Sequence, residues 1–159
     1  MSQNTASQII QVPNMLRLKV GKAASLDGDV IARAEAALKS LSGQFAQWLQ
    51  DEIDKLDAAR AAIQAEGMTS AAAEGLYLRA HDLKGLGTTY EFPLITRIAA
   101  SLCKLLDDAD KRAAAPLFLV DAHIHAIKAA VRDDIRDAGH PVGKALAEEL
   151  EGRVGEHLD

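Results

Sequence analysis

Apolar residues recur every three or four positions along most of the chain, which is the spacing of amphipathic α-helices. The longest of these patterns follows Asp29, a residue suited to capping a helix, and contains Ala34, Leu38, Leu41, Phe45, Leu49, Ile53, Leu56 and Ile63. Further stripes follow Thr69 or Ser70, then Pro93, then Pro116. Since proline and small polar residues favour helix boundaries, the pattern predicts four amphipathic helices.

Short connections between these helices predict an all-α fold, an antiparallel four-helix bundle over residues 28–138. We expect an N-terminal helical extension and, within residues 139–159, a short C-terminal helix or tail. Its apolar residues recur at intervals of four: Val142, Leu146, Leu150, Val154 and Leu158. Pro13 and Gly21 interrupt residues 1–27, which we expect to form an extended arm.

Composition narrows the class of protein. The 159 residues are 48% hydrophobic, which suits one domain with a core. The net charge of -5, with no cluster of basic and aromatic residues, argues against nucleic acid as a partner. A single cysteine, Cys103, allows no intramolecular disulfide, and no apolar run is long enough to span a membrane. We expect a cytoplasmic monomer that does not bind membranes.

The stretch HDLKGLGTTY, which begins at His81 and ends at Tyr90, contains two glycines although it continues a helical pattern. At about 100° per residue, the core face of this helix would hold Leu76, Ala80, Leu83, Gly87 and Tyr90. His81 would point outward, with Tyr77, Lys84 and Thr88 on one side and Leu78 and Gly85 on the other. The histidine is therefore predicted to be exposed, with a cation one turn later.

The two glycines call for different explanations. Gly87 faces the predicted core, where a missing side chain would let a neighbouring helix come close. Gly85 faces solvent, where a glycine costs about 1 kcal/mol relative to alanine and gains nothing from packing. An exposed glycine beside an exposed histidine suggests that a large partner approaches the imidazole, and the outward Leu78 would give it an apolar surface.

The run His81-Asp82-Leu83-Lys84-Gly85 resembles the histidine-containing phosphotransfer domain of bacterial phosphorelays. The hallmark of that family is His-x-x-Lys-Gly on the second helix of a four-helix bundle. The resemblance covers roughly residues 28–138. Many relatives continue the motif with small residues, whereas this chain has Leu86 and, further on, the β-branched Thr88.

The resemblance implies that His81 is the phosphoacceptor, that Lys84 steadies the phosphoryl oxygens and that Gly85 keeps the approach open. Tyr77, Leu78 and Thr88 are the candidate partner-binding residues. The partners would be response regulator receiver domains and a hybrid histidine kinase. The receiver would bring Mg²⁺ and an acidic pocket, so we expect no cofactor or metal site in this chain. The protein would be a relay intermediate and not an enzyme.

Other interpretations remain open at this point. The chain could be a helical interaction module that binds a partner through Tyr77, Leu78 and Thr88 without covalent chemistry. A metal carrier or bundle enzyme is disfavoured because paired Glu-x-x-His motifs are missing. His123 and His125 would diverge by about 200° on a helix and could not chelate one metal jointly. We expect Cys103, Phe45 and Trp48 to be core residues.

Overall fold

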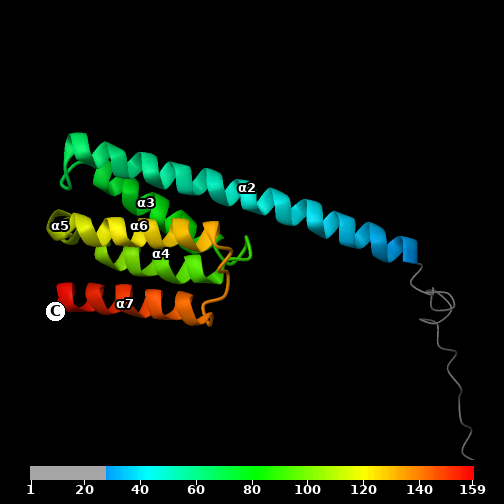
Figure 1. The fold of residues 1–159 in the computed structure, drawn as a ribbon. Helices are drawn as coiled ribbons and strands as arrows, with labels where there is room; N and C mark the ends of the chain where they lie inside the picture. Colours follow the sequence, from blue (N-terminus) through cyan, green and yellow to red (C-terminus); the bar gives the residue numbers. More distant parts are fainter. Residues whose placement is uncertain (1–27) are drawn as a thin grey trace, which may run out of the picture. The chain divides into compact units, whose positions relative to one another are not determined.

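The computed structural model describes residues 28–159, and most of this part of the chain is helical (Figure 1). The helices are α2 (Gly28–Glu66), α3 (Ala71–Leu86), α4 (Pro93–Leu105), α5 (Ala109–Ala114), α6 (Leu117–Arg132) and α7 (Pro141–Leu158). Residues 28–159 contain no strand, which confirms the all-α prediction. The arm predicted for residues 1–27 lies outside the described residues.

The chain divides into two compact units, Met1–Lys39 and Ser40–Asp159. Residues 28–39 of the first unit belong to α2, and all of them are exposed. In the second unit Leu41 is exposed, whereas α2 contributes Leu49, Ile53, Leu56 and Ile63 to the core of that unit.

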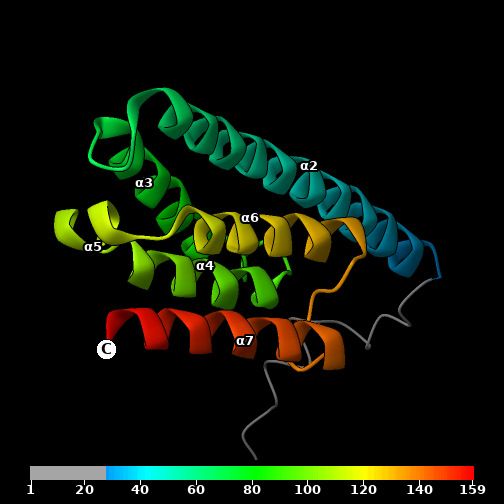
Figure 2. The ribbon, with the colours of Figure 1, turned by 60° about the vertical axis from the view of Figure 1, so that its left-hand side comes forward.

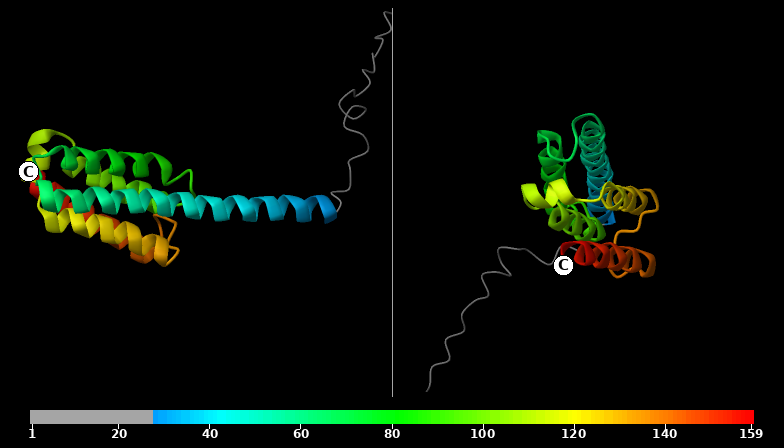
Figure 3. Two further views of the ribbon diagram at one scale, coloured as in Figure 1. Left: turned by 90° about the horizontal axis from the view of Figure 1, so that it is seen from above. Right: turned by 90° about the vertical axis from the view of Figure 1, so that its left-hand side faces the viewer.

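Helix α4 occupies the centre of the second unit. It packs against α3, α6 and α7, and α6 and α7 also touch each other (Figure 2). Eight of its residues are buried: Leu94, Ile95, Ile98, Ala99, Ser101, Leu102, Cys103 and Leu105. The right-hand view of Figure 3 looks roughly along these helices. No helix of residues 28–159 combines the length and the apolar character needed to cross a bilayer.

Helix α7 is longer than the short helix that we expected, with 18 residues against 16 in α6. Its buried residues are Gly143, Ala147, Leu150 and Val154, while Val142 is 60% exposed. A bidentate ion pair joins α7 to α4, because Nε and Nη2 of Arg97 each donate to a carboxylate oxygen of Glu151 at 2.7 Å. Apolar burial and this ion pair together attach α7 to the core.

Helix α3, which carries His81, has a defined start and end. The hydroxyl of Ser70 accepts a hydrogen bond from the backbone N–H of Ala72 at 3.2 Å, which caps the N-terminus as predicted. The helix ends at Leu86, and the chain then turns, so our extension of the helix to Tyr90 is wrong. Backbone bonds still hold the turn: the N–H of Phe92 donates to the carbonyl of Gly87 at 2.7 Å.

A buried histidine connects α6 to α4. Nδ1 of His123 lies 2.7 Å from the carbonyl oxygen of Leu119, and Nε2 lies 3.0 Å from Oγ of Ser101. Because a carbonyl oxygen only accepts, Nδ1 carries the proton, and the Ser101 hydroxyl donates to Nε2. Both ring nitrogens of His123 are therefore satisfied in the neutral form.

Burial lowers the pKa of His123 below the ordinary value of 6.5, although the bond to Leu119 acts in the opposite direction. Below about pH 6.5 the His123 side chain binds a proton in the unfolded chain but stays neutral in the folded chain. The free energy of unfolding should stay constant with respect to this group above pH 6.5 and fall below it, by at most about 1.4 kcal/mol per pH unit. Urea titrations between pH 8 and pH 5 measure this slope.

Two variants separate the contribution of His123 to the pH dependence of stability from that of the other titrating groups. His123→Leu should lower the free energy of unfolding at neutral pH. It should also reduce the slope of that free energy below about pH 6.5, because the side chain that takes up a proton only on unfolding is then missing. His125→Asn, at an exposed position of the same helix, should keep the slope of the wild type. An unchanged slope in His123→Leu would show that other groups cause the acid sensitivity.

Candidate functional site

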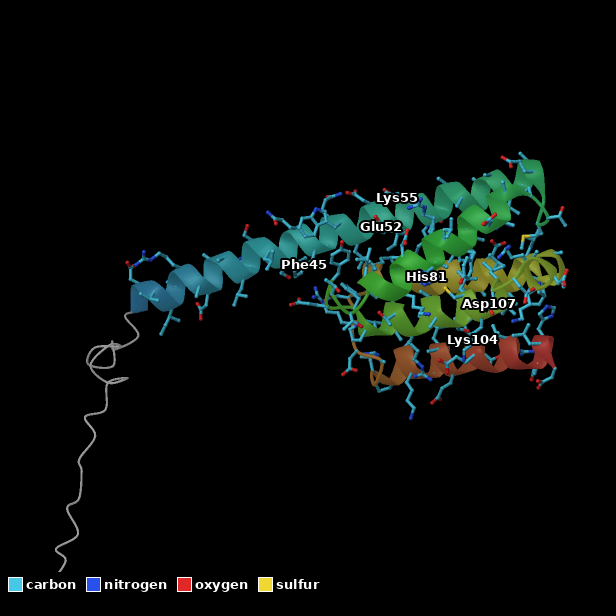
Figure 4. The ribbon with its side chains drawn as sticks, turned by 180° about the vertical axis from the view of Figure 1, so that it is seen from behind. Phe45, Glu52, Lys55, His81, Lys104 and Asp107 are labelled. Carbon is cyan, nitrogen blue, oxygen red and sulfur yellow. The ribbon has the colours of Figure 1, made fainter. Side chains whose placement is uncertain are left out.

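His81 lies on the exposed face of α3, as the helical period predicts (Figure 4). The opposite face of this helix is buried in the core through Ala73, Leu76, Ala80 and Leu83. In Figure 4, α3 runs between α2, which carries Glu52 and Lys55, and α4, which carries Lys104. The imidazole of His81 is therefore carried by a helix whose opposite face is packed in the core.

The structure confirms that the two glycines of the motif have different surroundings. A Cβ atom at Gly85 would meet no atom within 4 Å. At Gly87 it would lie 2.5 Å from Oγ1 and 2.7 Å from the backbone nitrogen of Thr96 on α4. Gly87 thus allows α4 to approach the end of α3 closely, whereas Gly85 leaves open space on the surface that carries His81.

Lys84 supplies a cation one turn after the histidine. The residue is exposed, and within residues 28–159 it forms no ion pair, in contrast to Arg79, which pairs with Asp82 at 3.3 Å. Lys84 also lies near α4: burial raises the pKa of the Cys103 thiol to about 11, and the Lys84 charge opposes that rise. The amino group of Lys84 is therefore available to an anion placed beside the imidazole.

Tyr77 and Leu78 flank the histidine one turn earlier. Leu78 is 50% exposed, while Tyr77 is half-buried and packs against the core. The Tyr77 ring lies 6.2 Å from the His81 imidazole, measured between centroids, and the Arg112 guanidinium lies 5.7 Å from the Tyr77 centroid. Arg112 also donates to the carbonyl of Leu106 at 2.9 Å, so it connects Tyr77 to the segment between α4 and α5.

Thr88 belongs to the turn after α3 and not to the helix itself. Its backbone N–H donates to Oγ1 of Thr96 at 2.9 Å, and the two hydroxyl oxygens lie 3.1 Å apart. Thr88 is exposed, yet its polar groups hold the turn against α4. Of the six residues singled out from the sequence, α3 brings together His81, Lys84, Gly85, Tyr77 and Leu78, and Thr88 stands apart.

Two groups of side chains from separate elements could not be predicted from the sequence. Arg112 lies 31 residues after His81, and no spacing rule connects them. The second group consists of Phe45, Trp48 and Tyr90, whose ring centroids lie 5.7 to 6.0 Å apart. Trp48 is 44% exposed, so our assignment of this residue to the core is wrong. Together with Asp51, Glu52 and Lys55, Trp48 and Tyr90 line a shallow hollow of about 350 Å³.

Three other side chains of the types that can bind metals have structural contacts. His123 is buried between α4 and α6, and Cys103 is buried in α4, where we expected a core residue. Asp121 accepts two hydrogen bonds from Arg60 of α2, at 2.6 and 3.0 Å. Across the described part of the chain, no three His, Cys, Asp or Glu side chains converge on a point where a metal could bind.

Comparison with known proteins returned no relative. No protein-family model, no curated protein and no solved structure matched the chain. The function is therefore inferred from the residues and geometry described above.

Proposed function

We propose that this chain is a histidine phosphotransfer protein. His81 accepts a phosphoryl group from the aspartyl phosphate of one receiver domain and passes it to the receiver domain of another response regulator. One observation carries the proposal: the exposed imidazole of His81 has the cation of Lys84, which forms no ion pair within residues 28–159, one turn away and the bare backbone of Gly85 beside it. A nucleophile, a charge for the phosphoryl oxygens and an open approach occur together on one helix face.

The chemistry needs little more from this chain. The lone pair of a neutral ring nitrogen attacks phosphorus and forms the P–N bond, while the P–O bond to the aspartate breaks and releases its carboxylate. Such a transfer depends on in-line positioning and on neutralisation of the equatorial oxygens. Lys84 contributes one positive charge, and the receiver contributes Mg²⁺ and its own acidic residues. The protein acts as a relay intermediate without an ATP site.

The proposed architecture is a four-helix bundle of α2, α3, α4 and α6, with α7 as an additional helix on α4 and α6. Support comes from the core that these helices share and from two ion pairs between α2 and α6, Arg60 with Asp121 and Lys128 with Asp57. We place the protein in the bacterial cytoplasm, where receiver domains and hybrid histidine kinases are its partners. Tyr77 and Leu78 would contact the docked receiver.

The test is a phosphotransfer survey with the full chain. Each phosphorylated receiver domain of the host is mixed with the protein, and radiolabel is followed on a gel. We expect at least one receiver to lose its label to this chain within minutes, and the label to be acid-labile and base-stable. Stable binding of a receiver without any transfer of label, across the whole set, would contradict the proposal and favour a non-catalytic interaction module.

A further inference from the structure

A shallow hollow beside α2 combines aromatic rings with carboxylates. Its volume is about 350 Å³, and its lining consists of four residues of α2 and one residue of the turn after α3: Trp48, Asp51, Glu52, Lys55 and Tyr90. All five belong to the unit Ser40–Asp159, and Figure 4 labels Glu52 and Lys55 on α2. None of them has a role in the phosphotransfer proposed for His81. We call this site the α2 hollow.

The fold holds the aromatic side of the α2 hollow in place. The N–H of Tyr90 donates to the carbonyl of Leu86 at 2.9 Å, and the Tyr90 ring packs against the core. The centroid of the Phe45 ring lies 5.8 Å from that of Trp48 and 5.7 Å from that of Tyr90. Trp48 is nevertheless 44% exposed. Tryptophan and tyrosine rings fixed at a surface offer flat apolar faces, and these faces attract cations electrostatically.

The other side of the α2 hollow is negatively charged. Asp51 is exposed, accepts a hydrogen bond from Nε2 of Gln47 at 3.0 Å and forms no ion pair within residues 28–159. The Glu52 side chain is 15% exposed, and its Oε1 lies 2.6 Å from Nζ of Lys55. Two carboxylates against one ammonium leave the hollow with a negative charge. Because burial weakens screening by water, the Glu52 carboxylate attracts a cation more strongly than a fully exposed one does.

We propose that the α2 hollow binds the guanidinium group of an arginine side chain from a partner protein. A guanidinium is planar and weakly hydrated, so it stacks on an aromatic ring while its N–H groups donate to carboxylate oxygens. The rings of Trp48 and Tyr90 supply the face for stacking, and the two carboxylates supply the acceptors. A lysine ammonium has no flat face and is more strongly hydrated. The proposal does not depend on phosphotransfer.

Lys55 is the internal competitor of this arginine. Its ammonium occupies one side of the Glu52 carboxylate, and the Lys55 side chain is 52% exposed. Ion pairs between residues three apart on a helix surface contribute little to stability. A guanidinium that donates to Glu52 therefore displaces the Lys55 ammonium into water at small cost. For a single arginine side chain we expect a dissociation constant on the order of 1 to 10 mM, since the hollow is shallow.

The fluorescence of Trp48 tests the proposal in the full chain, because Trp48 is the only tryptophan. The probe is N-acetyl-L-arginine amide, titrated to about 50 mM at constant ionic strength. It should change the emission in a saturable way. N-acetyl-L-citrulline amide, which has nearly the same shape and no charge, should cause no saturable change. N-acetyl-L-lysine amide should bind more weakly than the arginine probe, by about threefold or more.

Three variants locate the binding site. Asp51→Asn should weaken binding of the arginine probe by about threefold to tenfold, because one charged acceptor is lost. Asp54→Asn removes the same charge from α2 outside the lining of the hollow, where Asp54 accepts a hydrogen bond from Gln50 at 2.8 Å, and should bind like the wild type. Lys55→Met should bind the probe about twofold to fivefold more tightly, because Glu52 then lacks its internal partner.

Three results would overturn the proposal. The first is the absence of a saturable change with the arginine probe up to about 50 mM. The second is binding of the citrulline probe as tight as that of the arginine probe, or tighter binding of the lysine probe. The third is equal weakening by Asp51→Asn and Asp54→Asn, because the probe would then respond to the charge of α2 as a whole and not to the α2 hollow.

Discussion

Replacing Gly87 by alanine is expected to lower the free energy of unfolding by about 1 to 3 kcal/mol, the usual cost of overpacking. The new methyl carbon would lie 2.5 Å from Oγ1 of Thr96, 2.7 Å from the Thr96 nitrogen and 3.0 Å from the carbonyl oxygen of Phe92. Two of these atoms are backbone, so no side-chain rotation relieves the contact, and α4 must shift. Thermal unfolding should show a loss of about 3 to 10 °C.

Gly85→Ala is the matched control, because it places the same methyl group in open space near the same end of α3. Alanine is the better helix former, so this variant should gain up to about 1 kcal/mol. Equal stabilities for the two variants would show that Gly87 is not needed for the contact between α3 and α4.

Gly85→Leu should leave the fold intact and slow phosphotransfer by about tenfold to a hundredfold. Gly85 lies one turn after His81, and residues four apart on a helix have Cβ atoms only about 5–6 Å apart. A leucine there would occupy the space through which a receiver domain reaches the imidazole. The rate of label transfer under single-turnover conditions, measured with the receiver that the survey identifies, gives the effect directly.

Gly75→Leu controls for the change from glycine to leucine within α3. Gly75 also has no atom within 4 Å of a Cβ, but it faces a different side of the helix from His81. This variant should transfer at the wild-type rate. If Gly85→Leu also transferred at that rate, the open surface beside His81 would have no role in docking.

The sequence predicted the local features of α3 well because they depend on one helix alone. A period of 3.6 residues separates Leu76 and Leu83 from His81 and Lys84, and a fixed core face then exposes the histidine. The same reasoning assigned Gly87 to a close contact and Gly85 to open space. The end of the helix at Leu86 was not predicted. Gly87 still has helical dihedral angles, and the chain departs from the helix only where Thr88 donates a hydrogen bond to Thr96 of α4, a residue that the helical period of α3 does not reveal.

Features that depend on distant segments could not be predicted in the same way. Periodicity shows that one face of α2 is apolar, but it does not show which part of that face another element covers, as Leu38 and Trp48 demonstrate. In α7 the four-residue spacing from Val142 drifts by about 40° at each step, so that row winds around the helix. The buried row instead alternates spacings of four and three from Gly143.

Contacts around the site could not be predicted from the sequence either. Tyr90 meets Trp48, and Arg112 stacks on Tyr77, only because the folded chain brings separate elements together. No motif relates these residues in the sequence. The phosphotransfer motif was visible because His81, Lys84 and Gly85 are neighbours on one helix.

The position of the transferred phosphoryl group tests the central claim most directly. After reaction with a phosphorylated receiver, tandem mass spectrometry at alkaline pH should place the group on His81. His81→Gln should take up no label, while His125→Gln and His140→Gln, at two other exposed histidines, should be labelled like the wild type. Undiminished labelling of His81→Gln, or a phosphoryl group found on another residue, would contradict the account.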